Sequence, residues 1–179
     1  RVSFDFEDGS KLFFNDQRKF GWIKLIPSLE VKNLPFMQKV GPEPLDDDFT
    51  VEDFMHRFEQ RKNTSIKAAL LDQTVVAGVI YADESLWGAK IDPRRRVKDI
   101  TNDEFKSLYN EVRYVMDLSI KKGGSTDRNY VDAEGNKGSY LEFARVFRRE
   151  GQACKRCGHI IEKIKHAGRG THICPGCMH

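Results

Sequence analysis

All four cysteines of the 179-residue chain lie near its C-terminal end, as two pairs with two residues between the members of each pair. Cys154 pairs with Cys157 and Cys174 with Cys177, and the segment 158–173 separates the pairs. Each pair can form a tight knuckle, so that four thiolates point at one tetrahedral ion. Two disulfides are the alternative, but nothing in the sequence indicates secretion, where disulfides form. The spacing therefore predicts one structural Zn²⁺ ion, held by the four cysteines in a zinc-finger β-hairpin.

Three histidines, His159, His166 and His172, lie close to these cysteines in the sequence. Because four thiolates already complete a closed zinc site, we expect the histidines to lie at the surface. The insert between the pairs also carries Arg169, with a glycine on each side. The glycines let the backbone turn tightly and direct the guanidinium outward, where its planar fork suits phosphate oxygens. A solvated hairpin tip is the alternative interpretation.

The charge of the chain is unevenly distributed. The whole chain carries a net charge of +3, whereas residues 143–179 hold eight Lys and Arg against two Glu, which is 8 − 2 = +6. A basic end on a nearly neutral body favours a polyanion such as nucleic acid, although a solvated surface explains it equally well. The sequence contains no apolar run of about 20 residues and no signal-peptide pattern, so we expect a cytosolic protein without a membrane partner.

The N-terminal part of the chain has the alternation of a β domain. The segment 2–6 predicts a strand, Asp8 and Gly9 a hairpin turn, 12–14 the return strand, and 22–25 a third strand. So few strands cannot bury a sheet face on their own, so this part is expected to be the end of a larger β domain. The segment 41–44, Gly-Pro-Glu-Pro, predicts a rigid extended spacer at a domain boundary.

Beyond this spacer the pattern becomes helical. Thr50 with Asp53 predicts a helix start, 65–71 a short second helix, and 80–89 another helix. A capping box at 101–104 begins a longer helix, which Lys-Lys-Gly-Gly at 121–124 ends. Residues 123–139 read as a long loop, which inside a compact domain is usually functional or disordered. The longer helix is expected to bury one apolar face, formed by Phe105, Leu108, Tyr109, Val112, Val115, Met116 and Ile120.

Several segments occur together in a specific order, and the combination resembles the bacterial formamidopyrimidine-DNA glycosylases along the whole chain. They are DQRKFG (16–21), VGPEPL (40–45), IKAALLDQ (66–73), IYADE (80–84), GGST (123–126) and the four-cysteine finger. The resemblance implies an α+β chain with four parts. The first two are the incomplete end of an N-terminal β sandwich (1–34) and a linker (35–47). A helix–two-turn–helix DNA-binding domain (48–148), which contains a lesion-recognition loop (123–140), and a zinc finger (149–179) follow.

The resemblance also implies a function and a set of DNA contacts. Family members carry out base-excision repair of oxidised purines, such as 8-oxoguanine, by cleaving the glycosidic bond and then β,δ-eliminating the abasic site. The damaged base is flipped out of the duplex, and wedge residues fill the gap. Here Arg18 and Phe20 match the wedge, although the same residues fit an ordinary hairpin turn. Lys62 and Lys67 flank the start of the second helix, where backbone amides favour a phosphate. Lys62 matches a DNA contact of the family and Lys67 is expected to be another, although a solvated helix entry is the alternative.

Two further features match functional parts of the family. The segment from Gly124 through Ser125 and Thr126 to Tyr140 matches the loop that folds over the flipped lesion. Arg169 matches the zinc-finger arginine that grips phosphates and is assigned a role in δ-elimination. The implied partner is double-stranded DNA with an oxidised base, bound by a protein that is monomeric when full length and located in the bacterial cytoplasm at the nucleoid.

The chain departs from the family at two places. The family's nucleophile is an N-terminal proline followed by glutamate, whereas this chain begins with Arg1, so about the first third of a family member is expected to be absent. The family also has a Gly-Asn pair that is missing at 78–81, and its asparagine would contact a phosphate. We therefore expect the 179 residues alone neither to excise 8-oxoguanine nor to be trapped on DNA by borohydride.

Two alternative functions stay open at this point. One is an endonuclease VIII-like glycosylase for oxidised pyrimidines, which the segment GGST at 123–126 disfavours because those relatives resemble it poorly. The other is a non-catalytic zinc-ribbon module that binds nucleic acid. An activity assay of the chain with the expected N-terminal third restored separates an enzyme from a binding module.

Overall fold

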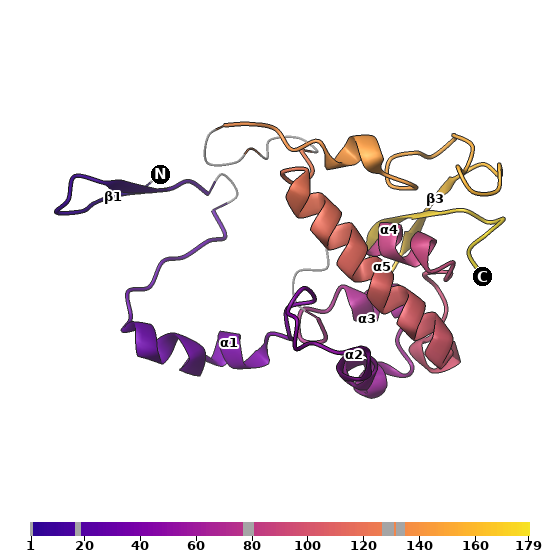
Figure 1. Ribbon diagram of the computed structural model, residues 1–179, viewed down its shortest axis with the longest axis horizontal. Coiled ribbons are helices and arrows are strands. Elements are labelled where there is room, and N and C mark those ends of the chain that lie inside the picture. Colours follow the sequence, from indigo (N-terminus) through magenta and orange to yellow (C-terminus); the bar gives the residue numbers. More distant parts are fainter. Residues whose placement is uncertain (1, 17–18, 77–80, 127–130, 132–134) are drawn as a thin grey trace. The chain divides into compact units, whose positions relative to one another are not determined.

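The chain forms two compact units, residues 1–38 and 39–179, in a computed structural model that describes residues 2–16, 19–76, 81–126, 131 and 135–179 (Figure 1). The boundary falls inside the predicted linker 35–47. The second half of that linker packs against the second unit. The Gly41 amide donates to the Gln73 carbonyl at 2.7 Å, and a Cβ on Gly41 would lie 2.6 Å from the Val75 carbonyl oxygen. Gly-Pro-Glu-Pro is therefore packed within the second unit.

The first unit contains the predicted hairpin. Strands β1 (Val2–Asp5) and β2 (Lys11–Phe14) pair antiparallel, and Gly9 takes a positive φ of 81° in the turn, which confirms this part of the prediction. The third strand at 22–25 was wrong, because these residues form no ladder with any described strand, and Leu25 is 98% exposed. Alternation alone does not make a strand, since a strand needs a neighbour for its backbone hydrogen bonds. A 3₁₀ helix, η1 (Ser28–Asn33), and helix α1 (Pro35–Lys39) follow.

The second unit begins with a group of helices. Two predicted helix starts are confirmed as complete capping boxes, in which the side chains of Thr50 and Thr101 accept from the amides of Asp53 and Glu104. Gly123 follows the longest helix with a φ of 67°, as the predicted glycine stop requires. The elements are α2 (Val51–Phe58), η2 (Glu59–Arg61), α3 (Ile66–Leu70), α4 (Ala82–Gly88), η3 (Val97–Asp99), α5 (Asn102–Lys121) and η4 (Tyr140–Phe143).

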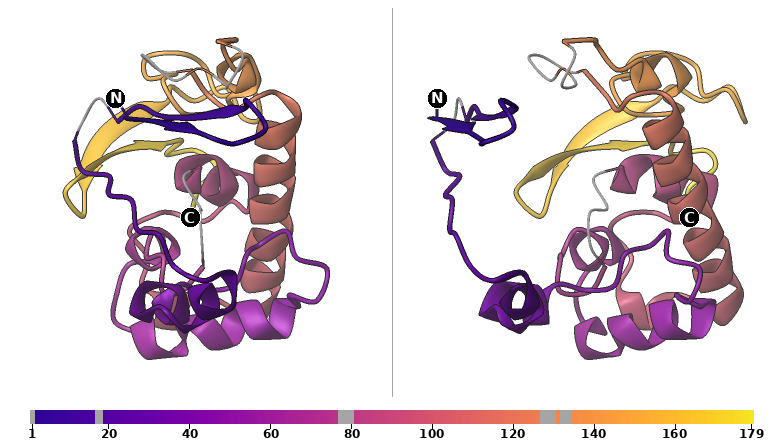
Figure 2. Two further views of the ribbon diagram at one scale, coloured as in Figure 1. Left: turned by 90° about the vertical axis from the view of Figure 1, so that its left-hand side faces the viewer. Right: turned by 60° about the vertical axis from the view of Figure 1, so that its left-hand side comes forward.

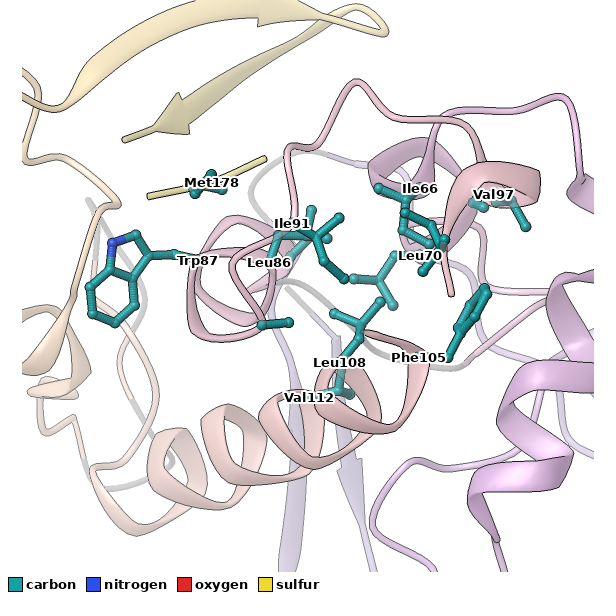
Figure 3. Packing of buried hydrophobic residues seen from close by; sticks show 14 of the residues in the cluster. Ile66, Leu70, Leu86, Trp87, Ile91, Val97, Phe105, Leu108, Val112 and Met178 are labelled. Atoms are coloured by element: carbon teal, nitrogen blue, oxygen red, sulfur yellow. The ribbon is translucent and has the colours of Figure 1, made fainter. Parts of the chain in front are cut away.

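Helix α5 packs against α2 and α4 and supplies one side of the hydrophobic core. Its side chains Phe105, Leu108 and Val112 are buried, and Figure 3 shows them directed toward residues of the other helices. Ile120 is 67% exposed, so its assignment to this buried face was wrong. Ile120 lies in the last turn of α5, and amphipathic spacing alone does not show where the packing partners end.

The C-terminal zinc finger shares this core. Strands β3 (Glu162–His166) and β4 (Arg169–Ile173) form an antiparallel hairpin, and its turn lies away from α5 in both views of Figure 2. Ile173 and Met178 belong to the same buried cluster as Leu86 and Trp87 of α4 (Figure 3). The helices and the finger are therefore one packed unit. No described helix is both long and apolar enough to cross a membrane.

Candidate nucleic-acid interface and zinc site

The four cysteine sulfurs form a compact cluster, as the sequence predicted. All four Sγ atoms lie within 4.8 Å of one another, and the Sγ atoms of Cys154 and Cys177 are 3.8 Å apart. Zn–S bonds of about 2.3 Å in a tetrahedron place two sulfurs about 3.8 Å apart. The Sγ atoms of Cys157 and Cys174 lie 3.3 Å apart, which excludes a disulfide of about 2.05 Å. The donor set and its spacing fit a zinc ion.

Two side chains outside the cluster contact its sulfurs. The Trp87 indole N–H donates to Cys154 Sγ at 3.3 Å, and the Arg156 guanidinium lies 3.7 Å from Cys177 Sγ. The same guanidinium stacks 3.7 Å from the Trp87 ring centroid. Donors to a ligating sulfur orient it and stabilise its negative charge. Trp87 of α4 therefore supports the metal site as well as the core, a role that the sequence analysis missed.

Arg169 begins strand β4 directly after the hairpin turn. Ala167 and Gly168 both take positive φ angles, 47° and 74°, and Arg169 pairs with His166 across the turn. A two-residue turn of this kind matches the twist of the flanking strands, so the predicted tight turn is confirmed. The Arg169 side chain is exposed and lines a pocket of about 220 Å³, together with Lys67, Tyr81, Asp83, Ser125 and Phe147.

Lys67 does not lie where a DNA contact was expected. Its side chain is 5% exposed, and its ammonium pairs with Asp83 Oδ1 at 2.6 Å. It also donates to Thr171 Oγ1 at 2.7 Å and to the Gly170 carbonyl at 3.2 Å. The ammonium is thus buried, paired with one carboxylate and hydrogen-bonded to two further acceptors within the protein. The prediction that Lys67 contacts phosphate is corrected, because this side chain joins α3 to β4 inside the protein.

His172 is also buried, at 2% exposure, so its assignment to the surface was wrong. Its backbone amide donates to Asp83 Oδ2 at 2.9 Å, and its Nε2 lies 3.2 Å from Glu150 Oε2. Burial by itself would raise the pKa of Asp83. The His172 and Lys67 contacts outweigh burial and hold that pKa below its ordinary value. Asp83 is therefore a buried anion that connects α4 to the hairpin.

Hydrogen bonds hold the stem of the predicted lesion loop. Tyr81 accepts from the Ser119 hydroxyl at 2.6 Å and donates to Ser125 Oγ at 3.2 Å, while the Thr126 hydroxyl accepts from the Gly138 amide at 2.9 Å. The Gly124 carbonyl accepts from the amide of Tyr140 at 3.1 Å. Tyr140 is 1% exposed and packs on the Tyr81 ring, so it anchors the loop. Residues 127–130 and 132–134 of the loop lie outside the described residues.

Of the remaining predicted DNA contacts, two are exposed side chains and one lies outside the described residues. Lys62 is exposed at the end of η2, and Phe20 is 77% exposed. Arg18 lies outside the described residues, as does the segment 77–80 that holds most of the shortened turn. Phe20 belongs to the first compact unit and Lys62 to the second, so each is placed only within its own unit.

Glu84 is a second buried acid that the sequence analysis did not single out. It is 1% exposed, and its carboxylate accepts backbone N–H groups from Arg145, Val146 and Phe147 at 2.7 to 2.8 Å. These bonds attach residues 145–147, which lead into the finger, to helix α4. An acid inside a helix pattern is usually solvated, so only the fold could reveal this contact.

The fold and the site define a class of protein in which a helical domain shares its core with a four-cysteine zinc finger. The sequence matches the family described as "Formamidopyrimidine-DNA glycosylase H2TH domain" over residues 40–130. It also matches "Zinc finger found in FPG and IleRS" over residues 151–179. The chain therefore belongs to the formamidopyrimidine-DNA glycosylase family.

Individual members of this family are similar to the chain in sequence and in structure. Formamidopyrimidine-DNA glycosylases of Desulforamulus reducens and Streptococcus pneumoniae are 44% and 43% identical to the chain over 179 residues, which is 99% of it. The chain spans 64% to 65% of the length of these relatives. A Lactococcus lactis Fpg complex with abasic-site DNA is similar with a TM-score of 0.85 and 39% identity, covering 98% of this chain and 65% of that one. The Thermus thermophilus MutM (Fpg) protein gives 0.88 and 35%, covering 99% and 68%.

Proposed function

We propose that this chain supplies the DNA-binding part of a bifunctional DNA glycosylase and AP lyase that removes oxidised purines in base-excision repair. Its family membership supports the glycosylase class, and solved relatives were bound to DNA with an abasic site or Fapy-dG. The implied partner is double-stranded DNA with a damaged base, bound by a monomer that carries one structural zinc ion. The bacterial cytoplasm and the nucleoid are the corresponding location.

The observation that carries this proposal is the placement of Arg169. Its guanidinium leaves a two-residue turn and lies at a pocket that also includes Tyr81 and Ser125, at the stem of the loop. A guanidinium has a planar fork of donors that matches two phosphate oxygens, so this position suits a phosphate beside a flipped nucleotide. Lys62 and Phe20 are proposed as further contacts, with Phe20 and Arg18 as the wedge.

The test is the salt dependence of binding to a duplex with a central abasic-site analogue, measured by fluorescence anisotropy. Removing one phosphate contact reduces the slope of log K against log salt by about 0.9, so Arg169→Ala should weaken binding and flatten the slope by that amount. Arg169→Lys keeps the charge but loses the fork, and is expected to keep the slope at lower affinity. Unchanged affinity and slope in Arg169→Ala would contradict the proposal.

A further inference from the structure

The ammonium of Lys67 reaches strand β4 at the two residues that follow Arg169. It donates to the Gly170 carbonyl at 3.2 Å and to Thr171 Oγ1 at 2.7 Å, while Asp83 pairs with it at 2.6 Å. Both charged side chains are almost entirely buried, at 5% and 7% exposure. Because the ammonium is buried and its charge is paired with Asp83, we infer that Lys67 is occupied within the protein rather than by a DNA phosphate.

The contact continues from Thr171 to Arg169. Thr171 is 0% exposed, and its hydroxyl donates to the Arg169 carbonyl at 3.3 Å while accepting from Lys67. The carboxylate of Asp83 then accepts the next backbone amide, that of His172, at 2.9 Å. Strand β4 is therefore attached to α3 and α4 at three consecutive residues, directly beside the one whose side chain lines the pocket.

We propose that Lys67, Asp83 and Thr171 are positioning residues for Arg169. They hold the backbone of β4 so that the guanidinium leaves the hairpin turn in one direction, and they act through Arg169 rather than by binding a phosphate themselves. This inference rests on the proposed function of Arg169. A buried ion pair is weak evidence for stability, because desolvation offsets much of the attraction, whereas its geometry specifies one arrangement of the hairpin. A phosphate group needs a donor placed to within a fraction of an ångström.

Thr171→Val tests the inference, because it removes the hydroxyl, keeps every charge and lies at a residue that cannot reach DNA. We would compare the intact chain, Thr171→Val, Arg169→Ala and the double variant for binding to the same abasic-site duplex. Losing one hydrogen bond corresponds to about a three- to tenfold weaker Kd when Arg169 is present. The same substitution should change Kd less than about twofold in the Arg169→Ala background, since interacting residues are not additive.

Two further variants keep the result interpretable. Thr171→Ser restores the hydroxyl and should return affinity to nearly that of the unmodified chain. Asp83→Asn keeps the shape and the acceptor for His172, and it should follow the same background dependence even if Thr171→Val does not fold. Zinc content and circular dichroism establish that each variant is folded.

The outcomes separate the two proposals. An equal loss of affinity in both backgrounds would mean that these residues only stabilise the finger, which overturns the positioning role while the role of Arg169 stands. If Thr171→Val loses no affinity in either background while Arg169→Ala itself binds more weakly, the positioning role is likewise overturned and the role of Arg169 stands. If Arg169→Ala binds as tightly as the unmodified chain, the proposed function of Arg169 fails first.

Discussion

Two lysines only five positions apart have different environments. Lys62 is exposed at the end of η2, whereas Lys67 on α3 is buried against Asp83 and β4. A charged side chain is buried only when partners replace its water. Lys67 pairs with Asp83 on α4 and finds two further acceptors about a hundred residues further along the chain. The proposed phosphate contact therefore belongs to Lys62, and Lys67 shapes the hairpin.

Replacing Lys62 should show this difference. Lys62→Ala is expected to reduce the salt slope of duplex binding by about 0.9, because one counterion-releasing contact is lost. Lys106→Ala is the matched control, since Lys106 is also exposed but lies on α5 beside Asp103. Anisotropy titrations at several salt concentrations measure both slopes. Equal slopes for the two variants would place Lys62 outside the DNA interface.

Among the elements, α5 shows how local and distant contacts combine. Its first turn has the Thr101–Glu104 capping box, and the Arg95 guanidinium also contacts Glu104, at 3.0 Å from Oε2. The hydrogen bond from Arg95 is the main reason that the pKa of Glu104 lies below its ordinary value. This carboxylate therefore links the start of α5 to the segment before η3.

Glu104→Gln should make the protein less stable in a pH-dependent way. In the folded protein the pKa of Glu104 is depressed below its unfolded value of about 4.3. The charge of Glu104 therefore stabilises the fold above about pH 4.3, and this stabilisation is lost as the pH falls through the folded pKa. Glutamine keeps the cap but not the charge, so unfolding free energy should fall by about 0.5–1 kcal/mol near neutral pH.

Urea unfolding of both proteins at pH 7 and in mild acid measures the difference between them. The zinc site is the same in the two proteins, so the difference isolates Glu104. This difference in unfolding free energy should be smaller in acid than at pH 7. A difference of the same size at both pH values would show that the charge is not what stabilises the helix start.

At the scale of the molecule, the finger and the helices share one core. Trp87 on α4 contacts the sulfur of Cys154, and Ile173 and Met178 of the finger belong to the helical cluster. Metal binding by a small finger is largely its folding free energy, so loss of zinc exposes part of the core that the helices use. The stability of residues 39–179 is therefore expected to depend on the metal as a whole.

Zinc removal should lower the melting temperature of this entire unit. We expect one zinc ion per folded chain by metal analysis. Chelation should shift the helical circular dichroism signal and the tryptophan fluorescence, to which Trp87 contributes, together, and added zinc should restore both. Cys157→Ser, which removes one ligand without a chelator, should give the same shift. If the helices melt at an unchanged temperature without zinc, the two parts are independent.

Short-range features were predictable from the sequence because their partners lie a few residues apart. The capping boxes at Thr50 and Thr101, the glycine stop after α5, the hairpin turn before Arg169 and the cysteine cluster all follow from local spacing. Backbone geometry and hydrogen bonding within one turn of chain decide such features, whatever the rest of the fold does. The family could likewise be predicted from the order of short segments.

The remaining features depend on partners far away in the sequence, so only the tertiary structure decided them. Lys67 and His172 are buried because α3, α4 and β4 meet around Asp83, which no spacing reveals. The segment 22–25 lacks a strand partner among the described residues, and Ile120 lies where the core has ended. The sequence determined which residues can form each element. Burial and charge pairing between elements determined that Lys67 supports the hairpin rather than facing solvent.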